Sequence, residues 1–445
     1  MRKANGKAAA VVDSGTSAAA EAAGGQVASL WRSRQFMGLW AGQSVSQIGS
    51  AVTVFVLPLV AIQKLGAGPG DVGLMRGLAA TAAILVAIPG GVLVDRRRKR
   101  RVMIACDLLT ATALVSLPVA ALLDVLRLAQ LYVVAFVTGA VALVFGVAYH
   151  AYIPRLVPVA ALKEANSKTA ATEAVARVSG PPLGASLVSL FGAATTVLLD
   201  VVSCLVSAAT IWRLTPAEGD RAGGERTKVD DAQGVWAQAK GGVRLVFANR
   251  TLTQTAVTTI GSMWAFAMFD AVLLYFMLTD LGVSTAVVGV VFAVGEAGGL
   301  LAALFVGKLM TWVGSARIMW LAVFLSAFAF LPVFAHGQQG AWLVAAFGAL
   351  SAARFVIFDV AQYVYRQTVC PQESFGRITA TIRLGIGIST ALGAFLGGLV
   401  GAAFSARAAL LVAAIVMCLA SLPVLVSAEL RRVRDIEELA SIDVG

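Results

Sequence analysis

Charged residues are scarce in this sequence. Only 13% of its 445 residues are Asp, Glu, Lys or Arg, whereas a soluble domain has roughly 25%. Hydrophobic residues make up 59% of the chain, and the mean hydropathy is +0.84. An ordinary soluble fold is therefore excluded, and the composition predicts an all-α protein that crosses a membrane several times.

The sequence also lacks the patterns that most enzymes, metalloproteins and ATP-driven pumps need. Its four cysteines stand singly, which indicates neither a disulfide framework nor a metal site. No phosphate-binding G-x-x-x-x-G-K-[ST] sequence occurs, and no serine–histidine–acid arrangement is visible. We therefore predict no catalytic residue, no metal and no cofactor.

Twelve apolar segments are long enough to cross a bilayer, which takes about 20 helical residues each. We place them at 35–62, 71–94, 102–124, 129–150, 164–190, 194–213, 252–279, 284–310, 318–336, 341–364, 376–402 and 405–427. Basic residues gather in alternate loops, most densely from Arg96 to Arg101. Since cytoplasmic loops retain Lys and Arg, both termini are predicted in the cytoplasm. The net charge of +11 thus reports topology, and without a base-reading motif we expect no nucleic-acid partner.

The two halves of the sequence repeat each other. Val72-Gly73 recurs as Val288-Gly289, and Leu183-Gly184-Ala185 recurs as Leu392-Gly393-Ala394. Parallel halves of six spans are typical of transporters that rock one half against the other. The predicted division is a disordered tail at 1–31, a six-helix bundle at 32–213, a linker with an interfacial helix at 214–250, a second bundle at 251–428 and a cytoplasmic tail at 429–445.

Several motifs resemble the major facilitator superfamily of transporters, over residues 32 to 428. Gly91, Asp95 and Arg96, followed by further basic residues, resemble its signature loop between the second and third spans, although Arg98 stands where a glycine is usual. The resemblance is closer to the branch of enterobactin-type siderophore exporters and macrolide efflux pumps, whose loop often ends in a run of arginines. Three further pieces resemble that branch: Leu39-Trp40-x-Gly42-Gln43-x-x-Ser46-Gln47-x-Gly49, Gly180-Pro181-x-x-Gly184, and Pro371 with Gly376-Arg377.

The resemblance implies a monomeric exporter in a bacterial inner membrane that works by alternating access and proton antiport. Its partners would be protons, the lipid bilayer and an amphipathic small molecule such as an antibiotic, a siderophore or a secondary metabolite. Some relatives carry an acid near position 50, where this chain has Ser50, so any proton carrier must lie elsewhere. Two alternatives stay open: nutrient uptake by proton symport, and a membrane-embedded sensor or enzyme on a transporter scaffold.

The basic loop is the first candidate site. Gly91, Asp95, Arg96, Arg100 and Arg101 are predicted to form a conformational latch. A carboxylate at a helix end can pair with arginine and cap a neighbouring helix in one state, then release it in the other. The alternative is that the loop only sets the topology.

Acidic residues inside spans are costly and usually functional. The proton-coupling candidates are Asp270, Glu296 and Asp359, and the alternative for each is a structural ion pair, for example Asp359 with Arg354. Asp107, Asp124, Asp200 and Asp280 lie nearer the predicted helix ends and are expected at the membrane interface.

Other polar and small residues complete the set of candidates. Glu173 and Arg177 are four residues apart and are predicted to pair within one helix. Gly180, Pro181 and Gly184 are predicted to pack helices together. Amide, hydroxyl, aromatic and guanidinium groups suit an amphipathic ligand, with helix packing as the alternative. The candidates for the substrate cavity are Gln43, Gln47, Ser50, Trp264, Phe266 and Arg354.

Overall fold

The computed structural model describes residues 30–214, 241–370, 372–436 and 438. Nearly all of the predicted N-terminal tail, the first part of the predicted linker, Pro371 and the last residues of the C-terminal tail lie outside this part of the chain. Within it, residues 241–248 of the predicted interfacial helix are helical, and no strand occurs among the described residues.

The described chain consists of long helices joined by short loops. The first half contains α2 (Arg34–Leu65), α3 (Pro69–Arg96), α4 (Lys99–Leu122), α5 (Leu128–Leu156), α6 (Leu162–Phe191), α7 (Ala193–Thr196) and α8 (Leu198–Arg213). The second half contains α10 (Arg250–Tyr275) with a π-helical turn (Phe276–Asp280), α11 (Thr285–Val313), α12 (Ser315–Phe324) with a 3₁₀ extension (Leu325–Phe334), α13 (Ala341–Val369), α14 (Gln372–Ala403), α15 (Ala406–Leu425) and α16 (Ala428–Arg432).

Eleven helical segments of the described chain are long and apolar enough to cross a membrane. The remaining predicted span, 164–190, corresponds to α6, a helix of 30 residues that carries more charge than the others. The predicted all-α membrane fold is thus confirmed, with eleven spans by this criterion.

The loops at the two ends of the helices differ in charge. We call one end the basic end, after the run Arg96 to Arg101. The loops at 157–161, 314 and 426–427 lie at the same end. The other end, the opposite end, carries the loops at 66–68, 123–127, 281–284, 335–340 and 404–405. Two of these loops begin alike, because Gly66 and Gly282 both adopt a left-handed φ of 63° that glycine allows without strain.

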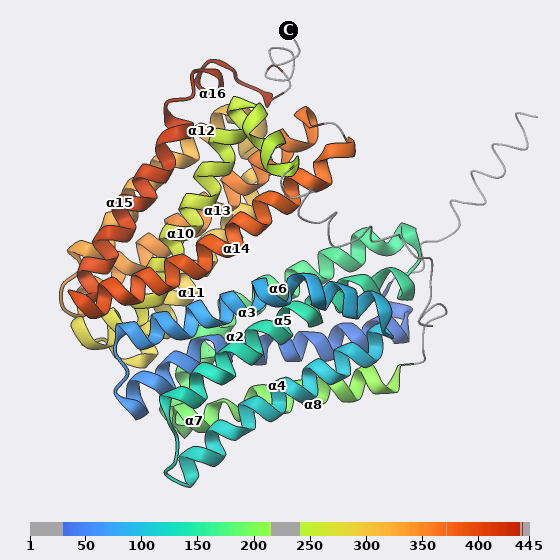
Figure 1. Ribbon diagram of the computed structural model, residues 1–445, viewed down its shortest axis with the longest axis vertical. Coiled ribbons are helices and arrows are strands. Elements are labelled where there is room, and N and C mark those ends of the chain that lie inside the picture. Colours follow the sequence, from blue (N-terminus) through green and yellow to red (C-terminus); the bar gives the residue numbers. More distant parts are fainter. Residues whose placement is uncertain (1–29, 215–240, 371, 437, 439–445) are drawn as a thin grey trace, which may run out of the picture.

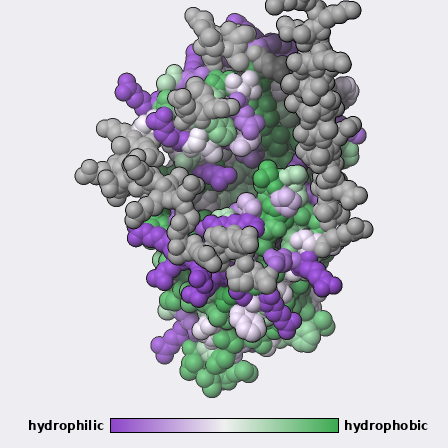
Figure 2. Space-filling view, turned by 90° about the vertical axis from the view of Figure 1, so that its right-hand side faces the viewer, coloured by the Kyte–Doolittle hydropathy of each residue, from purple (hydrophilic) through white to green (hydrophobic). Residues whose placement is uncertain are grey.

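The helices form two bundles that meet at the opposite end. Helices α2 to α8 make the first bundle and α10 to α15 the second, and the two diverge toward the basic end, at the right of Figure 1. Figure 2 shows the molecule from that side, where hydrophilic residues gather. Between the bundles, α3 packs against α14 and α6 packs against α11.

Small residues let the bundles approach at the opposite end. A Cβ added to Gly73 would lie 2.5 Å from Gly398 Cα and 2.7 Å from Ala394 O, and one added to Gly289 would lie 2.6 Å from Ala185 Cβ. The two contacts use equivalent members of the sequence repeat. Each pair of helices is therefore joined by the same local geometry, once in each half.

Near the basic end, the glycines of the repeat face open space. A Cβ on Gly91 or Gly307 would meet nothing within 4 Å. The close approach of helices that a glycine permits at position 91 is therefore not used in this conformation.

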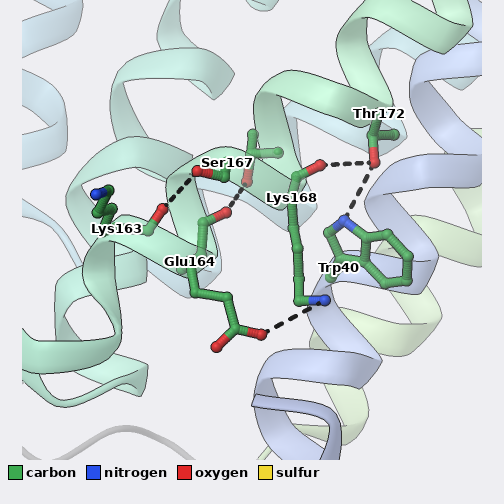
Figure 3. A network of polar contacts seen from close by, with 8 residues as sticks. Trp40, Lys163, Glu164, Ser167, Lys168 and Thr172 are labelled. Carbon is green, nitrogen blue, oxygen red and sulfur yellow. Dashed lines mark hydrogen bonds and ion pairs between the residues drawn. The ribbon is translucent and has the colours of Figure 1, made fainter. Parts of the chain in front are cut away.

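Polar contacts tie α6 to α2 within the first bundle (Figure 3). Trp40 Nε1 of α2 donates to Thr172 Oγ1 of α6 at 3.1 Å. Within α6, Lys168 Nζ lies 3.5 Å from Glu164 Oε1, and it also lies 3.6 Å from the ring centroid of Trp31, in the 3₁₀ turn (Leu30–Arg32) that precedes α2. These contacts hold the basic-end half of α6 against its own bundle, where the two bundles are apart.

We expect Gly73→Val to disfavour this conformation, because the added side chain would overlap the α14 backbone. Overpacking of this kind costs about 1–3 kcal/mol, which is roughly a five- to hundredfold change in a population ratio. Spin labels at Ser167 and Thr368, exposed near the basic end of α6 and α13, would report a shift toward shorter distances. Gly68→Ala is the control, since its Cβ would meet only Asp71 Oδ2, at 3.9 Å. Unchanged distances in Gly73→Val would contradict the role of this contact.

Candidate functional site

A cavity of about 620 Å³ lies between the bundles. It is mostly apolar, and four charged residues face it: Arg76, Arg177, Asp270 and Glu296. Its aromatic residues are Phe55, Phe266, Phe269, Phe292, Phe347 and Phe355. We call it the central cavity. A space of this size, with few polar groups among aromatic ones, is typical of sites for small organic molecules.

Two ion pairs cross from bundle to bundle in the wall of the central cavity. Arg76 Nη1 of α3 lies 3.3 Å from Asp270 Oδ2 of α10, and Arg177 Nε of α6 lies 3.7 Å from Glu296 Oε2 of α11. The first bundle supplies both guanidinium groups and the second both carboxylates. All four side chains are partly exposed, so each pair is moderate in strength and accessible to protons and ligands.

The prediction that Arg177 pairs with Glu173 along α6 is wrong in this conformation. Arg177 instead pairs with Glu296, because α6 packs against α11 and turns Arg177 toward the second bundle. Both Glu173 and Arg177 line a second cavity, described next.

The second cavity, of about 480 Å³, lies inside the first bundle, and we call it the bundle cavity. Three of the predicted substrate residues, Gln43, Gln47 and Ser50, line this cavity and not the central one. The two cavities share the lining residues Ala51, Val54, Arg76 and Arg177. The arginines of the two ion pairs therefore border both the central cavity and the interior of the first bundle.

The other predicted substrate residues are divided. Phe266 lines the central cavity, with its ring centroid 5.3 Å from that of Phe355. Trp264 and Arg354 line neither cavity. Arg354 is 2% exposed and donates to Ser262 Oγ at 2.8 Å and to Ser421 Oγ at 3.3 Å, inside the second bundle.

Asp359 does not face these cavities and does not pair with Arg354. Its Oδ1 accepts a hydrogen bond from Gln362 Nε2 at 2.9 Å, and Gln362 Oε1 accepts one from Thr259 Oγ1 at 2.9 Å. Of the three acids that the sequence singled out, Asp270 and Glu296 therefore line the central cavity, whereas Asp359 is exposed and bonded to Gln362 of its own helix.

Asp107 and Asp200, expected at the membrane interface, are buried inside the first bundle. They are 4% and 2% exposed, because α4 packs against α8 and α8 packs against α2. The position of Asp200 near a helix end does not predict its exposure, since the first turn of α8 lies inside the bundle. A usable signal was the polar stripe at Asp200, Ser203, Cys204 and Ser207, whose helical spacing marks one face of α8. Asp124 and Asp280, in contrast, are exposed.

The predicted latch residues form no ion pair with one another in this conformation. Asp95 is exposed and forms no ion pair among the described residues. Arg100 Nε donates to Ile211 O at 2.9 Å, and its Nη2 donates to Trp212 O, so this arginine caps the last turn of α8. Arg96 and Arg101 are exposed.

The predicted packing motif faces α2 and α11. A Cβ on Gly180 would lie 2.6 Å from Ala51 Cβ, and one on Gly184 would lie 3.0 Å from Phe55 Cδ1. Pro181 O lies 3.0 Å from where a Cβ on Gly289 of α11 would stand. The motif therefore lies where α6 contacts both its own bundle and the second one. No group of three His, Cys, Asp or Glu side chains that could hold a metal ion occurs in the described part of the chain.

Two helical bundles with a substrate-sized cavity between them define a membrane transporter of the major facilitator type. Solved structures with this fold include a bacterial homologue of the iron transporter ferroportin in an inward-facing state, 15% identical with a TM-score of 0.69, covering 88% of this chain and 98% of that one. A bacterial homologue of the human lysosomal transporter Spinster, inward-facing and unoccupied, is 13% identical with a TM-score of 0.68, covering 89% of this chain and 97% of that one.

The chain belongs to the major facilitator family described as transmembrane secretion effector, which matches residues 26–443. Macrolide efflux protein A of Streptococcus pyogenes is 27% identical over 194 residues, 42% of this chain and 46% of that protein. The uncharacterized transporter YfiS of Bacillus subtilis (strain 168) is 25% identical over 178 residues, 40% of this chain and 42% of that protein. The alignments thus span less than half the length of these curated relatives.

We expect Arg76→Gln and Asp270→Asn to weaken closure of the opposite end to the same degree, because both remove one cross-bundle ion pair. The double variant should shift the ratio of closed to open molecules no further than either single variant does, with an interaction energy of about 1 kcal/mol for a partly exposed pair. The distance populations between labels at Ser167 and Thr368 measure this ratio. Additive effects of the two changes would show that the groups act independently.

Proposed function

We propose that this protein exports an amphipathic small organic molecule from a bacterial cell by proton antiport, acting as a monomer in the inner membrane. The basic end and both chain termini face the cytoplasm in this proposal. The alternation of basic loops supports that orientation. The bundles then diverge toward the cytoplasm, as an exporter needs when it collects its substrate.

The observation that carries the proposal is the composition of the central cavity. Its six phenylalanines offer an apolar surface, and its two carboxylates are exposed enough to meet a cationic or polar group of the ligand. Such a site favours molecules with a large apolar body and few polar groups. The similarity to a macrolide efflux protein supports the same class of substrate and the same direction.

The ion pairs suggest how protons and substrate exchange. While Asp270 and Glu296 are ionised, they bind Arg76 and Arg177 and keep the opposite end closed. A bound substrate that competes for the carboxylates loosens both pairs, and the opposite end can open. Protonation from the outside then neutralises the carboxylates and releases the substrate. The proton leaves to the cytoplasm when the pairs form again.

We expect a strain that overproduces the protein to tolerate higher concentrations of some amphipathic antibiotics or siderophores. Asp270→Asn and Glu296→Gln should abolish this tolerance, because neither side chain can then exchange a proton or hold its arginine. Asp359→Asn is the matched control, since that carboxylate is held by Gln362 away from the central cavity. Growth-inhibition profiles of the four strains, at equal amounts of protein in the membrane, measure the effect.

Transport assays in vesicles separate export from its alternatives. An exporter accumulates its substrate in inside-out vesicles with an acidified lumen, and a symporter does so in right-side-out vesicles with an acidic exterior. A sensor or enzyme would bind the compound without moving it in either kind of vesicle. Accumulation in right-side-out vesicles, or binding without movement, would refute the proposal.

The basic loop is proposed to act as a latch when the bundles close at the basic end. Asp95→Asn should insert normally and lose at least about tenfold in transport rate, which corresponds to one lost ionic hydrogen bond of about 1.4 kcal/mol. Asp124→Asn, in an exposed turn at the opposite end, is the control. Initial efflux rates in vesicles test the effect, and a normal rate in Asp95→Asn would reduce the loop to a topology signal.

A further inference from the structure

We propose that Asp107 and Asp200 form a second proton-binding site, inside the first bundle and separate from the cross-bundle ion pairs. The pair of carboxylates would hold one proton in common, on one of the two groups at a time. Its existence is independent of the proposed export, whereas its part in coupling rests on that proposed function.

The two acids are buried among membrane-spanning helices, where charged side chains are costly. Asp107 lies on α4 and Asp200 on α8, and they are 4% and 2% exposed. These helices pack against each other, and both carboxylates line the bundle cavity. Neither forms an ion pair among the described residues. Two ionised carboxylates in such a place would be strongly unfavourable, so at least one proton must be bound.

Hydrogen bonds distinguish the two carboxylates. Asp200 Oδ1 accepts from Ser203 Oγ at 2.9 Å, from Ser50 Oγ at 3.3 Å and from Cys204 Sγ at 3.7 Å. Asp107 has fewer donors: its Oδ2 is buried with no hydrogen-bond partner within normal range, and the hydroxyl of Ser207 is the donor beside it. Donors favour the ionised form, so Asp200 is the carboxylate and Asp107 carries the proton.

A glycine of α2 leaves space for the Asp200 side chain. A Cβ on Gly49 of α2 would lie 2.2 Å from Ser203 Oγ and 2.8 Å from Asp200 Oδ1. The glycine therefore leaves room for this hydrogen-bonded pair. Nearby, Thr53 Oγ1 and Ser207 Oγ are buried without partners within normal range, and they offer further polar contacts when the charge at the site changes.

The other titratable groups around the bundle cavity leave the pair without a counter-ion. They are Arg76, Cys106, Tyr149, His150, Glu173, Arg177 and Cys204. Both arginines are paired with acids of the second bundle, at 3.3 and 3.7 Å. When those pairs open, the arginines become free to stabilise negative charge in the bundle cavity. Release of the proton from Asp107 is thereby linked to the conformation of the two bundles.

Infrared difference spectroscopy of the full chain in lipid nanodiscs tests the site without any substrate. We expect a protonated-carboxyl band near neutral pH that disappears at high pH as the O–H proton passes to water. Asp107→Asn should remove the band, and Asp124→Asn should leave it intact. A spectrum unaffected by Asp107→Asn overturns the proposal.

A milder change guards against loss of folding. Ser203→Ala removes one donor from Asp200 and keeps both acids, so the lower midpoint, at which Asp200 takes up a second proton, should rise by about one pH unit. An unchanged midpoint contradicts the shared site. Sodium chloride in place of choline chloride should not alter the band at constant pH. Loss of the band with sodium would mean that the carboxylates bind a metal cation, and it would overturn the proton assignment.

Proteoliposomes separate failure of this inference from failure of the proposed function. If the unmodified protein exports a substrate with a pH gradient and Asp107→Asn does so with the same pH dependence, the site has no part in coupling although antiport stands. If the unmodified protein ignores the pH gradient, proton antiport itself fails, and the infrared band still decides whether the site exists.

Discussion

The contact between bundles at the opposite end depends on residues that have almost no side chain. Gly73 of α3 lies against the backbone of Gly398 in α14, and Gly289 of α11 lies against Ala185 of α6. At Gly73 and Gly289 the backbones are held by many weak dispersion contacts. Four residues along α3, the Phe395 ring of α14 fills the space that Gly77 leaves, since a Cβ there would lie 2.6 Å from its Cδ1. The bundles therefore meet through close backbone contacts and an inserted ring, and α3 also contacts α10.

The same helical faces carry the cavity wall. Arg76 follows Gly73 by three residues and Phe292 follows Gly289 by three, so each lies on the face that its glycine presents to the partner. Arg76 reaches Asp270, and the Phe292 ring lies 5.8 Å from that of Phe55. A tilt at the glycines therefore moves a charged pair and an aromatic pair together. The cavity wall and the contacts that join the bundles at the opposite end thus lie within one turn of each other on the same helices.

The fold could be predicted from the sequence because it depends on local properties. Apolar runs locate the spans, and repeated glycines disclose the two halves. Asp270 and Glu296 could also be singled out, since an acid within an apolar run stands alone. Their partners could not be predicted, because each ion pair joins helices of different bundles. Arg177 illustrates this limit: the local rule favours Glu173, and only the packing of α6 on α11 offers Glu296.

Two buried polar centres give the bundles different chemical capabilities. In the second bundle, Arg354 is held by two serine hydroxyls, and its Nε has no hydrogen-bond partner. Among the described residues it has no acidic partner, and a guanidinium keeps its charge at any physiological pH. In the first bundle, Asp107 and Asp200 can relieve their repulsion by binding a proton. The charge on Arg354 is therefore fixed, whereas a change of protonation at Asp107 can alter the charge inside the first bundle. Since that interior borders Arg76 and Arg177, a proton bound there changes the electrostatic field on the two arginines that pair across the bundles.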